Sequence, residues 1–335
     1  MRKSRVSLAA AIAVTAAALT VQPALVASAA TDAPAAVGVR PLASPVGLTN
    51  GFFADPDSVP GTWVRNNPND SRAASIQASI ASRPIAKWFG NTSGTIGTAV
   101  GAYVGRAANA GKLPILVAYN IPGRDACGGQ SAGGAGSAAA YRTWIAAFAS
   151  AIGTRPAIVI IEPDSFGDFA CMSAAAIAER NGMLLFATQQ FRDRAPNTWA
   201  YLDAANAGWV DPSVMAQRLN DAGLANIHGF SVNVANYYWN SQSTTYANAL
   251  NSSLASRGYT KPFVFDSSRN GNGPNGQWCN PAGRKLGVPP QVGGGPEMLL
   301  WIKTPGSSDG LCGIAPTTPA GTFSPDIAMH LINGV

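Results

Sequence analysis

The sequence is poor in charged residues. Only 12% of its 335 residues are Asp, Glu, Lys or Arg, about half of the usual share, while 47% are apolar, enough for a sizeable core. The formal net charge is +6, and three of the positive charges lie within the first five residues. No basic run occurs elsewhere. The composition therefore argues against a disordered chain, and we expect no nucleic-acid partner.

Histidine and cysteine are also scarce. The two histidines, His228 and His330, form no cluster, and no cysteine lies in a C-x-x-C motif. A structural zinc site needs several such ligands close together, so we expect no metal and no cofactor. The four cysteines allow three disulfide pairings. They are Cys127, Cys171, Cys279 and Cys312.

Only one long apolar run occurs, at residues 6–21, directly after a basic start that contains Arg2, Lys3 and Arg5. The run is short for a membrane span, which needs about 20 residues. Ala27-Ser28-Ala29 follows, a small-x-small motif typical of signal-peptide cleavage. We therefore predict a secreted, extracellular protein with oxidised cysteines and no membrane contact after cleavage, rather than a membrane-anchored one.

The domain organisation follows from these features. The signal peptide is predicted at residues 1–29, and a short Ala- and Pro-rich lead-in at residues 30–44. A single domain is predicted at residues 45–335, because no Ser-, Thr- or Pro-rich linker separates an additional binding module from it. We expect this domain to be a monomer.

Short apolar segments alternate with longer stretches of helical composition from residue 85 onward. The predicted strands are 85–89, 115–119, 157–161, 199–202, 229–232, 263–265 and 299–302, and the predicted helices are 137–152, 173–191, 212–224 and 244–257. Strands that alternate with helices form parallel sheets, so the chain is predicted to be an α/β protein. Seven strands indicate a barrel somewhat short of eight.

The segment Ile158–Gly167 gives the first indication of function. Its four leading apolar residues predict a strand buried on both faces, and Pro163 ends that strand because it has no N–H group to donate. Glu162 and Asp164 follow at the carboxyl end of the strand, where β/α barrels build active sites. An ordinary acidic turn is the alternative interpretation.

Polar residues also follow the other predicted strands. They are Asn120, Asp125, Asp203, Asn233, Asn236, Asp266, Arg269, Lys303 and Asp309. A purely structural barrel has no reason to collect such groups at one end, so we predict an enzyme with several carboxylates in one cleft. Trp88, Trp209 and Trp278 lie near the same ends, and indoles beside polar groups are typical of sugar-binding sites. Trp144 and Trp301 are predicted to lie in the core.

Two short motifs point to other enzymes. Gly271–Gly276 matches the dinucleotide-binding pattern G-x-G-x-x-G, but Pro274 and the Trp-Cys-Asn-Pro run leave no helix start, so we reject it. Gly129–Gly133 matches G-x-S-x-G, which would make Ser131 the nucleophile of a secreted esterase or lipase, with His330 available. The preceding strand ends ten residues before this motif, so the serine hydrolase is the second hypothesis.

Six longer motifs together resemble glycoside hydrolase family 6, the cellulases that cut β-1,4-glucan with inversion. They are Val117–Asp125 (VAYNIPGRD), Ile160–Ser165 (IIEPDS), Asn233–Tyr237 (NVANY), Asp266–Pro274 (DSSRNGNGP), Trp278–Pro281 (WCNP) and Trp301–Gly310 (WIKTPGSSDG). They occur in the order found in the family. The resemblance implies a distorted, seven-stranded parallel β/α barrel, similar to a TIM barrel, in a single domain.

The resemblance also implies roles for particular residues. Asp164 matches the general acid, and Asp125 matches the carboxylate that raises the pKa of the acid and helps to organise the water. Asp309 matches the aspartate often proposed as the base. Tyr119 matches the tyrosine beneath the reacting sugar, and Ser131 matches the serine that helps to hold the water. Sugar-binding positions are matched by Trp88, Trp209, Asn236, Trp278 and Lys303, and the disulfides by Cys127–Cys171 and Cys279–Cys312.

The chemistry agrees with these roles. A glycosidic oxygen is a poor leaving group and needs a proton from an acid whose pKa a neighbouring carboxylate has raised. Inversion leaves room for a water, so the two carboxyl groups are expected roughly 6.5–9.5 Å apart. Only 43 and 32 residues separate the paired cysteines. Such short loops resemble those of members with an open cleft, and we predict an endoglucanase.

The predicted function is therefore a secreted, inverting endo-β-1,4-glucanase. A serine hydrolase and a non-catalytic glucan-binding protein are the alternatives. Four positions depart from the family pattern and affect sugar contacts rather than catalytic groups, namely Asn120, Ala126, Asn206 and Ser307. A buried structural role, rather than a substrate contact, is the alternative for Asp203, Asp266 and Arg269, and it is the favoured interpretation for Asp266 with Arg269.

Overall fold

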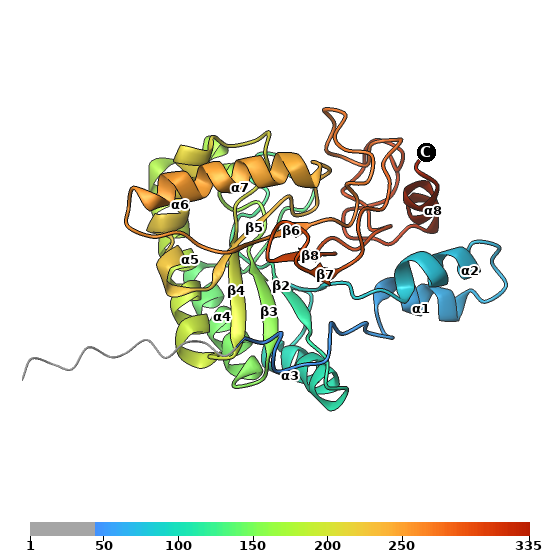
Figure 1. Ribbon diagram of the computed structural model, residues 1–335, viewed down its shortest axis with the longest axis horizontal. Coiled ribbons are helices and arrows are strands. Elements are labelled where there is room, and N and C mark those ends of the chain that lie inside the picture. The colour runs from blue at the N-terminus through green and yellow to red at the C-terminus, as the bar shows by residue number, and fades with distance from the viewer. Residues whose placement is uncertain (1–43) are drawn as a thin grey trace, which may run out of the picture. The chain divides into compact units, whose positions relative to one another are not determined.

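A curled β-sheet forms the centre of the fold (Figure 1). The computed structural model describes residues 44–335, which belong to one compact unit. The predicted signal peptide at residues 1–29 and all of the predicted lead-in except Ser44 lie outside the described residues.

Eight strands make up the sheet, in the order β1-β2-β3-β4-β5-β6-β8-β7. Their bounds are β1 Lys87–Phe89, β2 Ile115–Ala118, β3 Ala157–Ile161, β4 Thr198–Asp203, β5 Gly229–Val232, β6 Phe263–Asp266, β7 Gln291–Val292 and β8 Met298–Leu300. All neighbouring pairs are parallel except β7–β8. The seven parallel strands confirm the seven predicted segments. The sequence did not predict β7, which has only two residues, both exposed.

The two ends of the parallel sheet meet without a regular ladder. The N–H group of Ala86, just before β1, donates a hydrogen bond to the carbonyl of Trp301, just after β8, at 2.9 Å. The Trp88 indole N–H donates to the Ile302 carbonyl at 2.8 Å. The sheet is therefore a barrel that is distorted at this seam, in agreement with the predicted fold class.

Alternate residues of the central strands face two different hydrophobic layers. In β3, Ile158 and Ile160 lie in the inner cluster, whereas Val159 and Ile161 pack with the surrounding helices. All four side chains are fully buried. A strand covered on both faces needs apolar residues at every position, which explains the uninterrupted Ile-Val-Ile-Ile run. Trp301 is buried as predicted, and Trp144 is partly buried against the outer layer.

Eight α-helices accompany the described strands. Their bounds are α1 Val59–Asn66, α2 Ala73–Ile76, α3 Ile96–Asn109, α4 Ala138–Ile152, α5 Ala174–Arg194, α6 Pro212–Asp221, α7 Asn240–Ala255 and α8 Pro325–Asn333. The four predicted helices correspond to α4–α7. The sequence analysis missed α3, whose three glycines lower its helix propensity. None of the helices in residues 44–335 is long and apolar enough to cross a membrane.

The buried face of β3 supplies a test of the core. Replacing Ile160 by Ala should lower the free energy of unfolding by about 2–5 kcal/mol, because it removes apolar contacts and leaves a cavity. Val214→Ala on α6 is the matched control: its side chain is 44% exposed, and a change within about 0.5 kcal/mol is expected. Denaturant unfolding followed by circular dichroism measures both. Equal stability of the two variants would contradict this packing.

Candidate active site

The carboxyl ends of the strands carry unusual backbone conformations. All seven non-glycine residues with positive φ in the described part of the chain lie in segments after these ends: Asp125, Glu162, Asp164, Ala205, Asn233, Ala235 and Asn280. Such conformations cost energy and persist only where surrounding contacts enforce them, and they cluster at functional sites. This end of the barrel is therefore where the chain stores strain.

Glu162 provides contacts that hold one of these loops in its conformation. Its carboxylate is buried and accepts the N–H groups of Asn120 and Ile121, both at 2.9 Å, so the end of β3 holds the loop that follows β2. Burial raises the pKa of Glu162 to about 7, although these two N–H groups partly oppose the shift. Glu162 is occupied in supporting a loop and does not face a substrate.

Asp203 and Asp266 repeat the arrangement. Asp203, at the end of β4, accepts the Asp164 N–H at 2.9 Å. Asp266, at the end of β6, accepts the N–H groups of Ala235 and Lys303 at 2.9 and 2.8 Å. All three carboxylates are buried. The interpretation that a structural barrel has no reason to collect carboxylates at one end was therefore wrong for these three, because they bind backbone groups that the bent loops leave unpaired.

Asp164 differs from them. It is only partly buried, and in residues 44–335 no group donates a hydrogen bond to its carboxylate. Burial raises its pKa well above the usual range, and the charges of Asp203, Asp168 and Asp125 raise it further. Lys303 acts in the opposite direction. Asp164 therefore keeps its proton at a pH where an ordinary aspartic acid has lost it.

A chain of hydrogen bonds connects three of the predicted residues. Asp125 Oδ2 accepts the Ser131 N–H at 2.6 Å and the Ser131 hydroxyl at 3.1 Å. Because the Ser131 hydrogen points to Asp125, the Tyr119 hydroxyl, 2.9 Å away, donates to Ser131 Oγ. The Arg124 guanidinium lies over the Tyr119 ring at 4.5 Å and donates to the Ser131 carbonyl. Asp125 is thus fixed by its own loop.

The same contacts exclude the serine-hydrolase hypothesis. A nucleophilic serine needs a base, normally histidine, as its hydrogen-bond partner. Ser131 instead contacts a carboxylate and a phenol. His228 bonds to Glu297, and His330 bonds to the carbonyl of Val335. Neither histidine of the chain contacts Ser131. The G-x-S-x-G match therefore does not mark a nucleophile, and Ser131 instead donates hydrogen bonds to Asp125.

Asp309 is surrounded by positively charged side chains, whereas Asp164 is surrounded by carboxylates. Arg269 Nη1 and Lys303 Nζ approach its carboxylate at 2.9 and 3.0 Å, and the Tyr237 hydroxyl and the Asn280 N–H also donate to it. Burial alone would raise the pKa of Asp309, but Arg269 and Lys303 hold it well below the usual range. Asp309 is therefore a carboxylate whose charged form is favoured and whose two oxygens both have partners.

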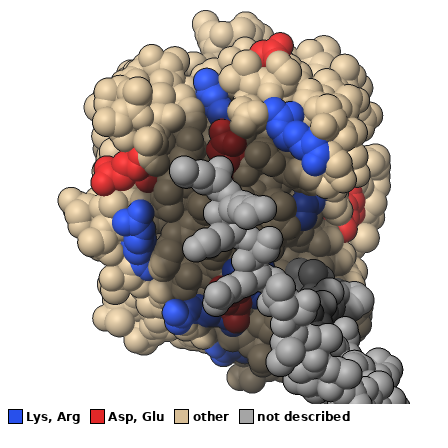
Figure 2. All heavy atoms as spheres, turned by 90° about the vertical axis from the view of Figure 1, so that its left-hand side faces the viewer, with Lys and Arg blue, Asp and Glu red and all other residues tan. Residues whose placement is uncertain are grey.

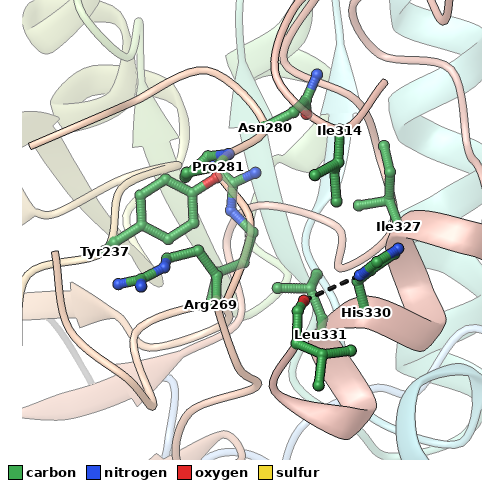
Figure 3. A pocket seen from close by; sticks show the side chains of 10 residues that line it. Tyr237, Arg269, Asn280, Pro281, Ile314, Ile327, His330 and Leu331 are labelled. Atoms are coloured by element: carbon green, nitrogen blue, oxygen red, sulfur yellow. Dashed lines mark hydrogen bonds between the residues drawn. The ribbon is translucent and has the colours of Figure 1, made fainter. Parts of the chain in front are cut away.

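The predicted partnership of Asp266 and Arg269 was wrong in its pairing. Both residues are buried, but Asp266 binds backbone N–H groups and Arg269 binds Asp309. The guanidinium of Arg269 also stacks on the Tyr237 ring at 4.4 Å. Figure 3 shows these two side chains in a small pocket that reaches His330 on α8. Tyr237 and Arg269 also contact Asp309, whereas Asp164 does not line this pocket.

Arg180 on α5 is a site residue that the sequence analysis missed. Its buried guanidinium donates to the Ser165 carbonyl at 3.1 Å and to the Gly123 carbonyl at 2.7 Å, and pairs with Asp168 at 3.1 Å. It therefore joins the loop that carries Asp125 to the loop that carries Asp164. An arginine in the middle of a helix gives no sequence signal for such a role.

Two disulfides reinforce loops that carry carboxylates of the site. Cys127 pairs with Cys171 and Cys279 pairs with Cys312, as the resemblance implied. Cys127 follows Asp125 by two residues, and Cys312 follows Asp309 by three. Each bond therefore limits the motion of a loop that carries a carboxylate of the site.

Exposed tryptophans lie in the segments that follow β4, β5 and β6. Trp209 and Trp278 are 42% and 52% exposed, and Trp239, which the sequence analysis did not select, is 49% exposed. The Trp209 ring lies directly on Gly167, where any side chain would collide with it. Trp88 is partly buried and packs edge-to-face on Tyr119 at 5.1 Å. Indole faces held in this way are suited to the apolar faces of sugar rings.

The other predicted contacts are less exposed. The amine of Lys303 is occupied by Asp309, and the Asn236 side chain accepts the N–H of Tyr237. Asn206 is buried and stabilises its own turn through the Gly208 N–H. On the face shown in Figure 2, charged side chains of both signs lie among mostly uncharged ones. In residues 44–335, no group of His, Cys, Asp or Glu could hold a metal ion.

Arg180 provides a test of the scaffold. Arg180→Met should lower the free energy of unfolding by about 3–5 kcal/mol, because it leaves the Asp168 carboxylate buried without its partner. Turnover should also fall, since the Asp125 and Asp164 loops lose their common anchor. Arg192→Met, on the exposed side of the same helix, should change stability by no more than about 0.5 kcal/mol. Urea unfolding measures the stability of both variants. An Arg180→Met variant as stable as the wild type would contradict the role of Arg180 in joining the two loops.

Glu162 gives a prediction about pH. Its pKa is raised from 4.5 to about 7 by burial, so between these values the folded state keeps a proton that the unfolded state releases. The free energy of unfolding should therefore fall as pH rises from about 4.5 to about 7. Glu162→Gln should make this slope shallower, whereas Glu179→Gln on the surface of α5 should leave it unchanged. Identical slopes in all three proteins would count against a buried, protonated Glu162.

Comparison with known proteins adds independent information. The model of the family described as Glycosyl hydrolases family 6 matches residues 52–335. The chain is 59% identical over 293 residues to Endoglucanase 1 of Streptomyces halstedii, covering 87% of this chain and 91% of the relative. It is 41% identical over 287 residues to Endoglucanase A of Thermobispora bispora, covering 84% of this chain and 61% of that relative.

Comparison with solved structures also finds a similar endoglucanase. The fold is similar to the endoglucanase Cel6 from Mycobacterium tuberculosis, solved in complex with methyl-cellobiosyl-4-deoxy-4-thio-β-D-cellobioside. The TM-score is 0.79 and the sequence identity 36%, over 87% of this chain and 99% of that chain. A raised-pKa carboxyl beside a second carboxylate, exposed tryptophans and the family match over nearly the whole described chain lead to one conclusion: this chain belongs to glycosyl hydrolase family 6.

Proposed function

We propose that this chain is a secreted, inverting endo-β-1,4-glucanase that hydrolyses internal bonds of cellulose and related β-glucans. The observation that carries the proposal is the environment of Asp164, a partly exposed carboxyl whose pKa is raised by burial and by the neighbouring charges of Asp203, Asp168 and Asp125. Such a group can donate a proton to a leaving glycosidic oxygen near neutral pH.

In the proposed reaction, Asp164 protonates the glycosidic oxygen while a water attacks the anomeric carbon from the opposite face. The bond to the leaving sugar breaks, and the water loses a proton as the new bond to carbon forms. Asp309 is poorly suited to take that proton, because Arg269 and Lys303 keep its pKa low and occupy its oxygens. We assign it the electrostatic role of fixing Lys303 and the loop.

Asp125 is the better proton acceptor in this proposal. It lies close enough to Asp164 to raise that residue's pKa. Ser131 and Tyr119 form the hydrogen-bonded chain that ends at its Oδ2. A water bound to Ser131 can therefore pass its proton toward Asp125 without direct contact between the carboxylate and the sugar. After the product leaves, the protonated Asp125 releases its proton to solvent, and the ionised Asp164 takes up a proton from solvent.

Substrate and mode of action are supported by the relatives. The two relatives named above are endoglucanases, and the similar solved structure contains a thio-linked cello-oligosaccharide. Trp209 and Trp278 offer exposed indole faces for pyranose rings. The short segments between the paired cysteines favour an open cleft, in which a chain is cut at internal positions. Secretion is inferred from the leader sequence.

The decisive experiment compares the wild type with Asp164→Asn on carboxymethyl cellulose, measuring viscosity and released reducing ends. A rapid loss of viscosity per bond cut is expected for the wild type, with turnover reduced about 10²- to 10⁴-fold in the variant because the general acid is gone. Asp221→Asn, an exposed carboxylate on α6, is the matched control and should behave as the wild type.

The other outcomes are also informative. Activity that persists in Asp164→Asn would mean that the acid is misassigned. Binding of soluble cellulose without hydrolysis by the wild type would favour the non-catalytic glucan-binding alternative. Proton NMR of the first product should show the α-anomer, and a β-anomer would refute inversion.

A further inference from the structure

A second concave site lies apart from the carboxylates, between α1 and the segment that precedes α8. It is a cavity of about 320 Å³ that is widely open to solvent. Trp63 and Phe323 form its aromatic part, and Thr62, Asn66 and Asp57 supply hydroxyl, amide and carboxylate groups. Small-molecule sites in proteins have volumes of about 300–1,000 Å³, and this cavity is large enough for a sugar unit.

The aromatic part of the cavity is held in place. The Trp63 ring lies 6.0 Å from the Phe323 ring, and the Arg72 guanidinium lies over Trp63 at 5.6 Å. Arg72 is in turn fixed by ion pairs with Asp70 and with Asp326 on α8. Trp63 is therefore a pre-ordered surface, which reduces the entropy lost when a ligand packs on it.

The polar part favours a neutral ligand. The charge of Asp57 is balanced by Arg65 at 3.1 Å, so the rim has no net charge to attract an ion. The Asn66 side chain is exposed, at the carboxyl end of α1. An indole face beside amide, hydroxyl and carboxylate oxygens matches a pyranose ring, which has an apolar C–H face and hydroxyls at its edge.

The cavity is connected to the Asp309 segment through the backbone. The Ser324 N–H donates to the Gly306 carbonyl at 2.8 Å, and the Ser308 N–H donates to the Thr322 carbonyl at 2.9 Å. The Phe323 ring lies on Gly306, where an added Cβ would come within 2.5 Å of it. The wall of the cavity is thus paired with the three residues that lead to Asp309.

We propose that this cavity is a second glucan-binding site, which holds a glucose unit of a β-glucan on Trp63. The identity of the ligand rests on the proposed function, whereas the site itself rests on the cavity and its lining. Such a site would keep the enzyme on an insoluble glucan between cuts and raise the local concentration of chains near the cleft.

The first test observes Trp63 directly. The indole N–H groups of the eight tryptophans are labelled with ¹⁵N in the Asp164→Asn protein, which prevents turnover, and cellotetraose is added. The Trp63 signal, assigned by its absence in Trp63→Phe, should shift in a saturable manner. A Trp63 signal that stays unchanged while the signals of Trp209 or Trp278 saturate would overturn the proposal.

The second test measures adsorption to amorphous cellulose in the same Asp164→Asn background. Asn66→Ala should lower the association constant about fivefold, the size expected for one lost hydrogen bond. Asn248→Ala, an exposed asparagine on α7, is the matched control and should leave the constant unchanged. Equal constants for both variants would overturn the proposal. A Trp63 shift in a protein whose wild type does not hydrolyse glucan would instead support the site and refute the proposed function.

Discussion

Buried carboxylates at the carboxyl ends of the strands are the constraint on which this site depends. Parallel strands of a barrel end together, and the sharply bent loops that follow leave N–H groups without backbone partners. Glu162 and Asp203 each capture N–H groups of the loop after the preceding strand, and Asp266 captures those of the loops on both sides of it. Unpaired buried N–H groups are costly, so each of these bonds determines a loop conformation.

The loop that carries Asp164 has a strained backbone conformation. Asp164 has a φ of 67°, which an aspartate rarely adopts. Its N–H is held by Asp203, and the same carboxylate contributes to the raised pKa of Asp164. One interaction therefore contributes both to the position and to the protonation of this carboxyl group. Arg180 and the Cys127–Cys171 disulfide then tie this loop to the loop of Asp125.

The other side of the site is built with the opposite electrostatics. Asp309 shares its carboxylate between Arg269 and Lys303, and its pKa is lowered rather than raised. Two aspartates in one enzyme thus differ in protonation because one is surrounded by carboxylates and the other by cations. Because Arg269 and Lys303 hold the pKa of Asp309 well below the usual range, Asp309 is better suited to hold Lys303 than to exchange protons.

The sequence by itself determined the strand–helix alternation, the apolar core strands and the motifs at their ends, because burial on both faces and chain reversal demand particular residue types locally. It also led to the family and to the disulfide pairs through the resemblance. It did not reveal that Glu162, Asp203 and Asp266 bind backbone, that Arg269 pairs with Asp309, or that Arg180 joins two loops. Those roles depend on which residues distant in sequence meet when the barrel curls, and only the tertiary structure decides that.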